Sequence, residues 1–175
     1  MRNPQLAPAL TRALSERPFG QGRKRRVVLL GVGAELRGDD AAGVLIAQRI
    51  ESLHLPDVRA LAGGTAPENL TGEIRQLSPS HLIIVDTADM GEEPGTIRLV
   101  DPKEIGGMSF GTHALPLSVL AGYLAHETGC AVSIMGIQPR SLEFDAGLTP
   151  EVAQAVEEAV QALSRCLAQA PEAGS

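Results

Sequence analysis

The feature that most constrains this chain is a short apolar run, followed by a glycine-containing loop, two adjacent aspartates and a helix-prone segment. Residues 26–43 read RVVLLGVGAELRGDDAAG. The aliphatic run at residues 27–30 is typical of a strand buried on both faces of a parallel sheet. Residues 41–50 are apolar and helix-prone. We therefore expect Asp39 and Asp40 just beyond the carboxyl end of a strand, where open α/β sheets place their binding sites.

This aspartate pair also has a purely structural interpretation. A carboxylate in the first turn of a helix faces the positive end of the helix dipole, which is worth roughly 0.3–1 kcal/mol when exposed. Aspartate is also a favoured N-cap residue, and capping is an adequate account of Asp39. Nucleotide binding is disfavoured, because Leu36 stands where the pattern G-x-G-x-x-G needs its third glycine. The sequence has no G-x-x-x-x-G-K-[ST] loop either.

The rest of the chain predicts a three-layer α/β/α fold with a mostly parallel, twisted sheet of about five strands. Apolar runs and turn signals give the order β-α-β-α-β-β-α-β-α. The further strands are expected at residues 58–62, 81–85, 96–100 and 131–137, and the further helices at 65–77, 115–126 and 149–167. We expect residues 25–169 to form one domain. A disordered extension, with at most a short helix near residues 10–16, would precede it at 1–24, and a tail would follow at 170–175.

Composition excludes several classes of protein. No run approaches the roughly 20 apolar residues of a membrane span, and the basic segment at 23–26 lacks the features of a signal peptide, so we expect a cytoplasmic protein. The net charge is −6, but residues 1–26 hold seven basic residues and one acidic residue. The remaining eight basic and twenty acidic residues give a net charge of −12, which disfavours nucleic-acid binding.

Catalysis by cysteine or serine has little support in the sequence. Cys130 and Cys166 are far apart and form no C-x-x-C motif, so free thiols are expected. A catalytic cysteine would need a histidine partner, and neither thiol is placed near His113. Serine catalysis is disfavoured because no G-x-S-x-G motif is present.

Three residues stand out by their positions in the predicted fold. Asp40 opens the first helix of the domain, Asp86 follows the apolar strand HLIIV, and His113 precedes the helix at 115–126. In a doubly wound sheet all three would lie on the rim formed by the carboxyl ends of the strands. Two carboxylates and an imidazole suit a borderline divalent metal and leave coordination positions open for a substrate. The alternative is an exposed loop histidine beside two unrelated aspartates.

Five blocks of the sequence, in order, resemble those of a known family. They read GVGAELRGDDAAG, GGTAPEN, LIIVDTADMGEEPGTIRLVDP, THALPLSVL and MGIQPRSLEF. Together they resemble the hydrogenase maturation endopeptidases, and in particular the hydrogenase-3 (formate hydrogenlyase) type. The resemblance covers about residues 27–163. One departure is Ala34, where the family usually has asparagine.

This resemblance implies an aspartic-type or nickel-dependent endopeptidase. Such an enzyme removes the C-terminal extension from the large-subunit precursor of a [NiFe]-hydrogenase after nickel insertion. The family's metal-contacting and catalytic positions fall on Asp40, Asp86 and His113. The nickel would belong to the substrate and would not be a resident cofactor, and a monomer is favoured.

The resemblance leaves open whether Asp40 is a general base or only a metal contact. Two other functions also remain open. One is a non-catalytic maturation factor that binds nickel or the precursor. The other is a metal-dependent hydrolase of small molecules.

Overall fold

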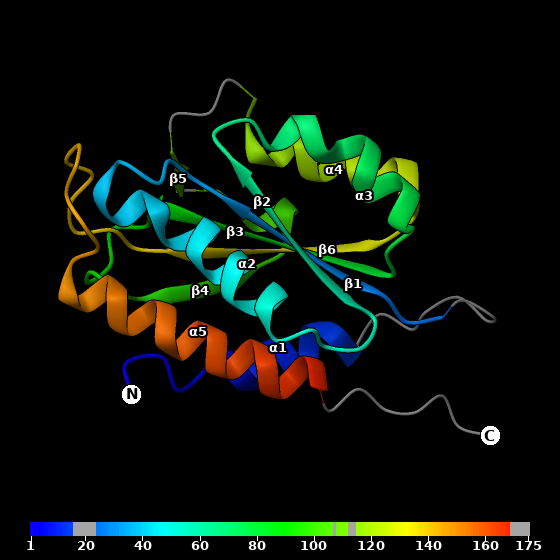
Figure 1. The fold of residues 1–175 in the computed structure, drawn as a ribbon, viewed down its shortest axis with the longest axis horizontal. Coiled ribbons are helices and arrows are strands. Elements are labelled where there is room, and N and C mark those ends of the chain that lie inside the picture. Colours follow the sequence, from blue (N-terminus) through cyan, green and yellow to red (C-terminus); the bar gives the residue numbers. More distant parts are fainter. Residues whose placement is uncertain (16–23, 107, 112–114, 169–175) are drawn as a thin grey trace.

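A six-stranded, mostly parallel sheet forms the centre of the protein (Figure 1). The computed structural model describes residues 1–15, 24–106, 108–111 and 115–168. Along the main path the strands lie in the order β2 (Val58–Gly64), β1 (Val27–Val32), β3 (His81–Asp89), β6 (Ala131–Ile137) and β4 (Ile97–Val100). β4 runs antiparallel to β6 at one edge, and β5 (Ser109–Phe110) pairs antiparallel with the end of β3. The predicted fold class is confirmed.

Helices cover both faces of the sheet, which gives the three layers. In Figure 1, α3 (Thr71–Leu77) and α4 (Leu117–Thr128) lie at the top, while α1 (Leu6–Ser15) and α5 (Pro150–Ala168) lie at the bottom. The helix α2 (Ala42–Ser52) packs with α1 and α5 in one apolar cluster, and α3 and α4 belong to the other. Short 3-10 helices connect the layers at η1 (Gly38–Ala41), η2 (Pro67–Leu70) and η3 (Pro102–Glu104).

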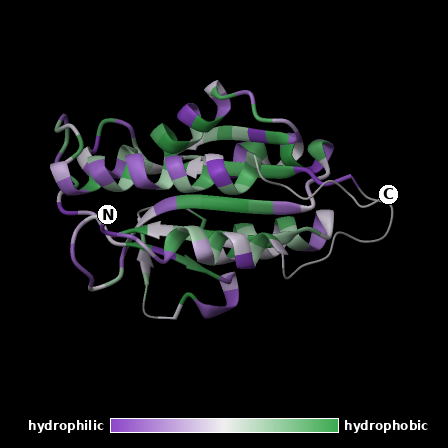
Figure 2. Cartoon of the chain, turned by 90° about the horizontal axis from the view of Figure 1, so that it is seen from below, coloured by the Kyte–Doolittle hydropathy of each residue, from purple (hydrophilic) through white to green (hydrophobic). Residues whose placement is uncertain are grey.

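The two clusters explain why the central strands are apolar throughout. In β1, Val27 and Leu29 face the α1/α2/α5 layer, whereas Val28 and Leu30 face the α3/α4 layer. A strand covered on both faces has no solvent side for polar residues. Figure 2 shows hydrophobic strands that lie between helices of mixed hydropathy.

Two glycines bring α2 close to the strands at the carboxyl end of the sheet. A Cβ atom at Gly43 would collide with the carbonyl oxygens of Val32 and Val85, and one at Gly31 would collide with the carbonyl oxygen of Gly43. The helix start therefore lies directly against β1 and β3, which places η1 and its aspartates at the end of the sheet.

The N-terminal segment differs from the expectation of a disordered extension. Residues 6–15 form α1, and Leu6, Leu10 and Leu14 are buried in the cluster that contains α5. Ahead of this helix, Asn3 is buried and donates from Nδ2 to the carbonyl oxygen of Gly95 at 3.0 Å. Residues 16–23 and the tail at 170–175 lie outside the described residues.

The central strand β3 is longer than the sequence indicated. We expected the strand to stop at Val85, but it continues to Asp89 because β6 and then β5 supply pairing partners beyond Val85. Asp86 pairs with Gly136 of β6, and Ala88 pairs with Phe110 of β5. Within the described ranges, no helix is both long enough and apolar enough to cross a membrane.

Candidate active site

Asp40 lies in η1, between β1 and α2, and its side chain is held by two donors. The residue is 7% exposed. Its Oδ2 accepts a hydrogen bond from the amide of Ala34 at 2.9 Å, and its Oδ1 accepts one from the hydroxyl of Thr87 at 2.6 Å. These bonds join the loop after β1 to the end of β3 and fix the carboxylate between them.

Asp86 is fully buried within the same end of β3. Its Oδ1 accepts a hydrogen bond from the amide of Thr87 at 2.8 Å. Thr87 therefore contacts both carboxylates, with its amide at Asp86 and its hydroxyl at Asp40. Burying a carboxylate costs free energy unless the group is hydrogen-bonded or paired. Two buried carboxylates at one place therefore depend on the donors that this end of the sheet supplies. The structure brings together the two aspartates that the sequence placed on one rim.

His113, the third predicted site residue, lies outside the described residues, which omit 112–114. The segments on either side of it can be placed. β5 pairs with the end of β3 just before this position, and α4 begins just after it. A groove of about 270 Å³ lies between these two elements, lined by Ile105, Phe110 and Leu117 among others. Among the residues the structure does place, no three His, Cys, Asp or Glu side chains are grouped to hold a metal ion.

Asp39 does not cap the helix, and the expectation of a cap is wrong. Neither η1 nor α2 has a side-chain cap hydrogen bond. The fully buried Asp39 carboxylate instead accepts four hydrogen bonds from the connection between β6 and α5. The donors are the amides of Arg140 (2.8 Å), Ser141 (3.0 Å) and Thr149 (2.7 Å) and the hydroxyl of Thr149 (3.0 Å). Its partners lie about a hundred residues away, so the local sequence gave no signal for this role.

Thr87 is a second residue that the sequence did not single out. It is 2% exposed, and its contacts to both carboxylates depend on β3 continuing beyond Val85. A strand that ended at Val85 would have left Thr87 in a turn. The only available signal was its position directly after Asp86.

The two cysteines are free, as predicted. Cys130 is buried and directly precedes β6, at the end of the sheet opposite the aspartates. Burial raises the pKa of the Cys130 thiol, which disfavours the reactive thiolate. Cys166 lies in α5 and is partly buried, and its Sγ donates to the carbonyl oxygen of Ala7 at 3.7 Å.

Comparison with known proteins gives a consistent result. A family model described as hydrogenase maturation protease matches residues 44–165. The hydrogenase 3 maturation protease of Escherichia coli K12 is 41% identical over 137 residues, which cover 78% of this chain and 87% of that protein. The hydrogenase 2 maturation protease of the same organism is 34% identical over 144 residues, covering 78% and 87%.

The fold is also shared with solved structures. A crystal structure of the [NiFe] hydrogenase maturation protease HycI from Thermococcus kodakarensis KOD1 superimposes with a TM-score of 0.76 at 33% identity, covering 85% of this chain and 96% of that one. A crystal structure of the hydrogenase 3 maturation protease gives a TM-score of 0.70 at 40% identity, covering 78% and 88%.

Proposed function

Because this chain belongs to the hydrogenase maturation protease family, we propose that it removes a C-terminal extension from the large-subunit precursor of a [NiFe]-hydrogenase after nickel insertion. One observation carries the proposal at the level of the site. Asp40 and Asp86, buried at the carboxyl ends of neighbouring parallel strands, are joined through Thr87. This pair occurs on a fold shared with crystal structures of maturation proteases.

The proposed site consists of Asp40, Asp86 and His113, and nickel enters it as part of the substrate. Carboxylate oxygens and an imidazole nitrogen are suitable ligands for a borderline divalent ion. A carboxylate oxygen has two lone pairs, so Asp40 Oδ1, which accepts from the Thr87 hydroxyl, is able to make a further contact. The substrate-bound nickel would serve as the feature by which a completed precursor is recognised.

In this proposal Asp40 has a second role as the candidate general base. A general base must lie within hydrogen-bond reach of the proton it removes. Asp40 is the more exposed of the two carboxylates, and the hydrogen bonds from Ala34 and Thr87 fix its orientation. It would take a proton from the water that attacks the scissile carbonyl, while Asp86 and His113 hold the substrate metal.

The deciding experiment compares nickel-loaded and nickel-free precursor. Each is incubated with the purified protein, and both are weighed by mass spectrometry. We expect a C-terminal peptide to be lost from the nickel-loaded form alone. Cleavage of both forms would retain the protease and reject nickel recognition.

A binding assay with the precursor, and a metal and amidase assay of the purified protein, separate the two alternative functions. Binding of the precursor without any loss of mass would identify a non-catalytic maturation factor. A small-molecule hydrolase would instead retain a metal of its own through purification and would hydrolyse small amides in the absence of precursor.

A further inference from the structure

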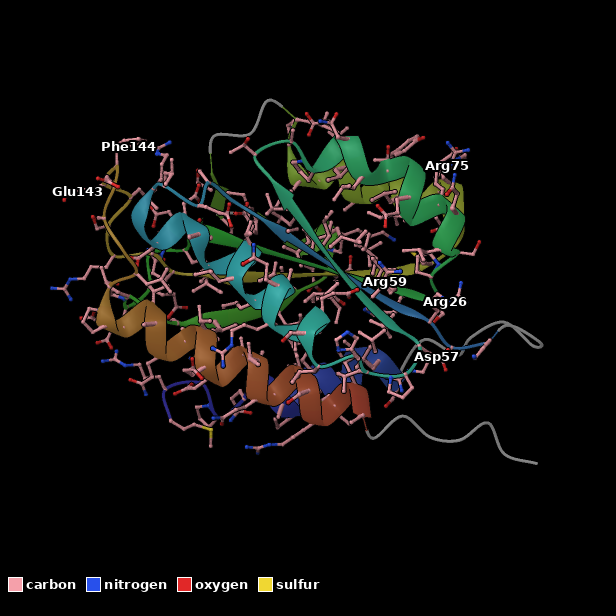
Figure 3. The ribbon with its side chains drawn as sticks, viewed as in Figure 1. Arg26, Asp57, Arg59, Arg75, Glu143 and Phe144 are labelled. Atoms are coloured by element: carbon pink, nitrogen blue, oxygen red, sulfur yellow. The ribbon has the colours of Figure 1, made fainter. Side chains whose placement is uncertain are left out.

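Three large apolar side chains are exposed on two neighbouring loops beside the candidate site. Leu36 is 61% exposed, Leu142 is 37% exposed and Phe144 is 74% exposed. Leu36 lies in the loop at residues 34–38 and the other two lie in the loop at residues 140–146, and we call these segments the loop pair. Figure 3 shows Phe144 and Glu143 at the tip of the second loop, at the end of the molecule where α2 begins.

The loop pair is cross-linked by backbone hydrogen bonds. The amide of Asp145 donates to the carbonyl oxygen of Leu36 at 2.7 Å, and the amide of Asp39 donates to that of Ser141 at 3.0 Å. Gly38 permits this approach, because a Cβ atom there would lie 2.8 Å from the carbonyl oxygen of Ser141 and its φ is +55°. The two loops therefore form a single surface.

The Asp39 carboxylate anchors both ends of the second loop of this surface. Its buried carboxylate accepts the amides of Arg140 and Ser141 at the start of the second loop, and both polar groups of Thr149 beyond its end. Fixed in this way at both ends, the second loop keeps Leu142 and Phe144 facing solvent. Exposed apolar groups on a rigid support are a feature of binding surfaces.

The loop pair is continuous with the candidate active site. Asp40 directly follows Asp39, and its carboxylate is held by the amide of Ala34 at the start of the first loop. Leu36 is therefore only two residues from the amide that holds the Asp40 carboxylate. The rim is acidic on balance, because the exposed Glu35, Glu143 and Asp145 outnumber the exposed Arg37, and Arg140 is paired with Glu151.

We propose that the loop pair is a docking surface for the folded body of the precursor, separate from the contacts made by its cleaved C-terminal segment. This inference rests on the proposed function. The complementary surface would have an apolar centre and basic groups around it. A second copy of this chain is a poorer occupant, because a chain with a net charge of −6 would face the acidic rim with charge of the same sign.

The test uses the full chain with Leu36→Ser and Phe144→Ser, singly and together. Leu53→Ser is the matched control, because Leu53 is 47% exposed at the opposite end of α2 from η1. Steady-state processing of nickel-loaded precursor is measured for each variant. We expect KM to rise at least tenfold for the double variant, with kcat at saturating precursor retained, and both constants to be unchanged for Leu53→Ser. Circular dichroism melts check that all variants are folded.

Several results would overturn the docking surface. One is an unchanged KM in the double variant, and another is a fall in kcat without a change in KM. A wild-type dimer that the double substitution dissociates, with precursor processing unaffected, would assign the loop pair to self-association.

A binding measurement with the same precursor distinguishes failure of the docking surface from failure of the proposed function. If wild type binds the precursor without cleaving it, weaker binding by the double variant alone still supports docking. Equal binding by wild type and the double variant rejects it. A wild-type protein that neither cleaves nor binds the precursor rejects both proposals.

Discussion

The two ends of the sheet use charge in opposite ways. At the carboxyl end, Asp39, Asp40 and Asp86 are buried, and they accept hydrogen bonds from backbone amides and hydroxyl groups. At the amino end, the charged side chains are largely exposed and pair with one another. Arg59, which Figure 3 labels at this end, contacts Glu51 at 3.0 Å and Glu73 at 4.0 Å.

This difference teaches that the two ends of the sheet offer charged groups of different kinds. The amino end has a pocket of about 440 Å³, lined by residues that include Arg26, Asp57 and Arg59, whereas the groove beside β5 measures about 270 Å³. Exposed ion pairs are worth about 0–1 kcal/mol and constrain little. The aspartates at the carboxyl end are instead buried and held in place by backbone amides and hydroxyl groups, so that end offers fixed carboxylates for chemistry.

The most direct test of this comparison removes one carboxylate charge at each end of the sheet in turn. Asp86→Asn retains an oxygen for the amide of Thr87, and Asp40→Asn retains one for Ala34 while the Thr87 hydroxyl can rotate to accept. We expect each to lower precursor processing at least about 1,000-fold, the scale seen for the loss of a principal catalytic group. Mass spectrometry of the precursor gives the rate.

The matched control is Glu73→Gln at the amino end, where processing should be unchanged. A circular dichroism melt confirms that each variant is folded. Full processing by both Asp40→Asn and Asp86→Asn would remove the carboxyl end from the proposed chemistry.

Much of the fold could be predicted because its main signals are local. The run at residues 131–137 became β6 without a change of boundary, since a strand covered on both faces must be apolar at every position. The meeting of Asp40 and Asp86 also followed from local reasoning, because neighbouring parallel strands end on the same rim. These expectations needed only the strand assignment and the parallel topology.

The features that were missed depend on partners distant in the sequence. A short helix was expected near residues 10–16, but α1 begins at Leu6 and packs on α5. A ten-residue helix is marginal alone in water, so its stability comes from this packing. The extension of β3 to Asp89 needs β5 and β6 as partners. The hydrogen bonds of Asp39 depend on a loop about a hundred residues later. Periodicity and spacing report none of these contacts.

The stabilities of the two ends should also differ. Asp39→Ala removes the acceptor for four donors, three of them amides, and leaves them without a partner in a buried site. We expect the free energy of unfolding to fall by roughly 2–4 kcal/mol, because each unsatisfied buried group costs about 1–3 kcal/mol and water can relieve some of them. Urea denaturation measures the change.

Glu73→Ala is the comparison at the amino end. Its contact with Arg59 is exposed and long, so a loss below about 0.5 kcal/mol is expected. Equal losses in Asp39→Ala and Glu73→Ala would contradict the distinction between a built polar cluster and a solvated one.

A smaller effect on the free energy of unfolding is expected for Glu158 of α5. This carboxylate is partly buried, between the buried aspartates and the exposed ion pairs. Burial acts to raise its pKa, but hydrogen bonds from the amides of Arg2 and Asn3 and from the side chains of Asn3 and Gln154 outweigh burial, so the pKa is lowered. The unfolded chain then binds more protons in acid than the folded chain does. The stabilisation is therefore present above the unfolded-state pKa of about 4.3 and is lost as the pH falls through the lower folded-state value.

Glu158→Gln should consequently destabilise the protein at pH 7 by no more than about 1 kcal/mol, because the site is partly exposed. The difference between wild type and variant, measured by urea denaturation from pH 7 to pH 3, should shrink as the pH falls. A difference that stays constant over that range would show that the anchoring of the N-terminal segment on α5 does not depend on the charge of Glu158. The buried-charge behaviour would then be confined to the carboxyl end of the sheet.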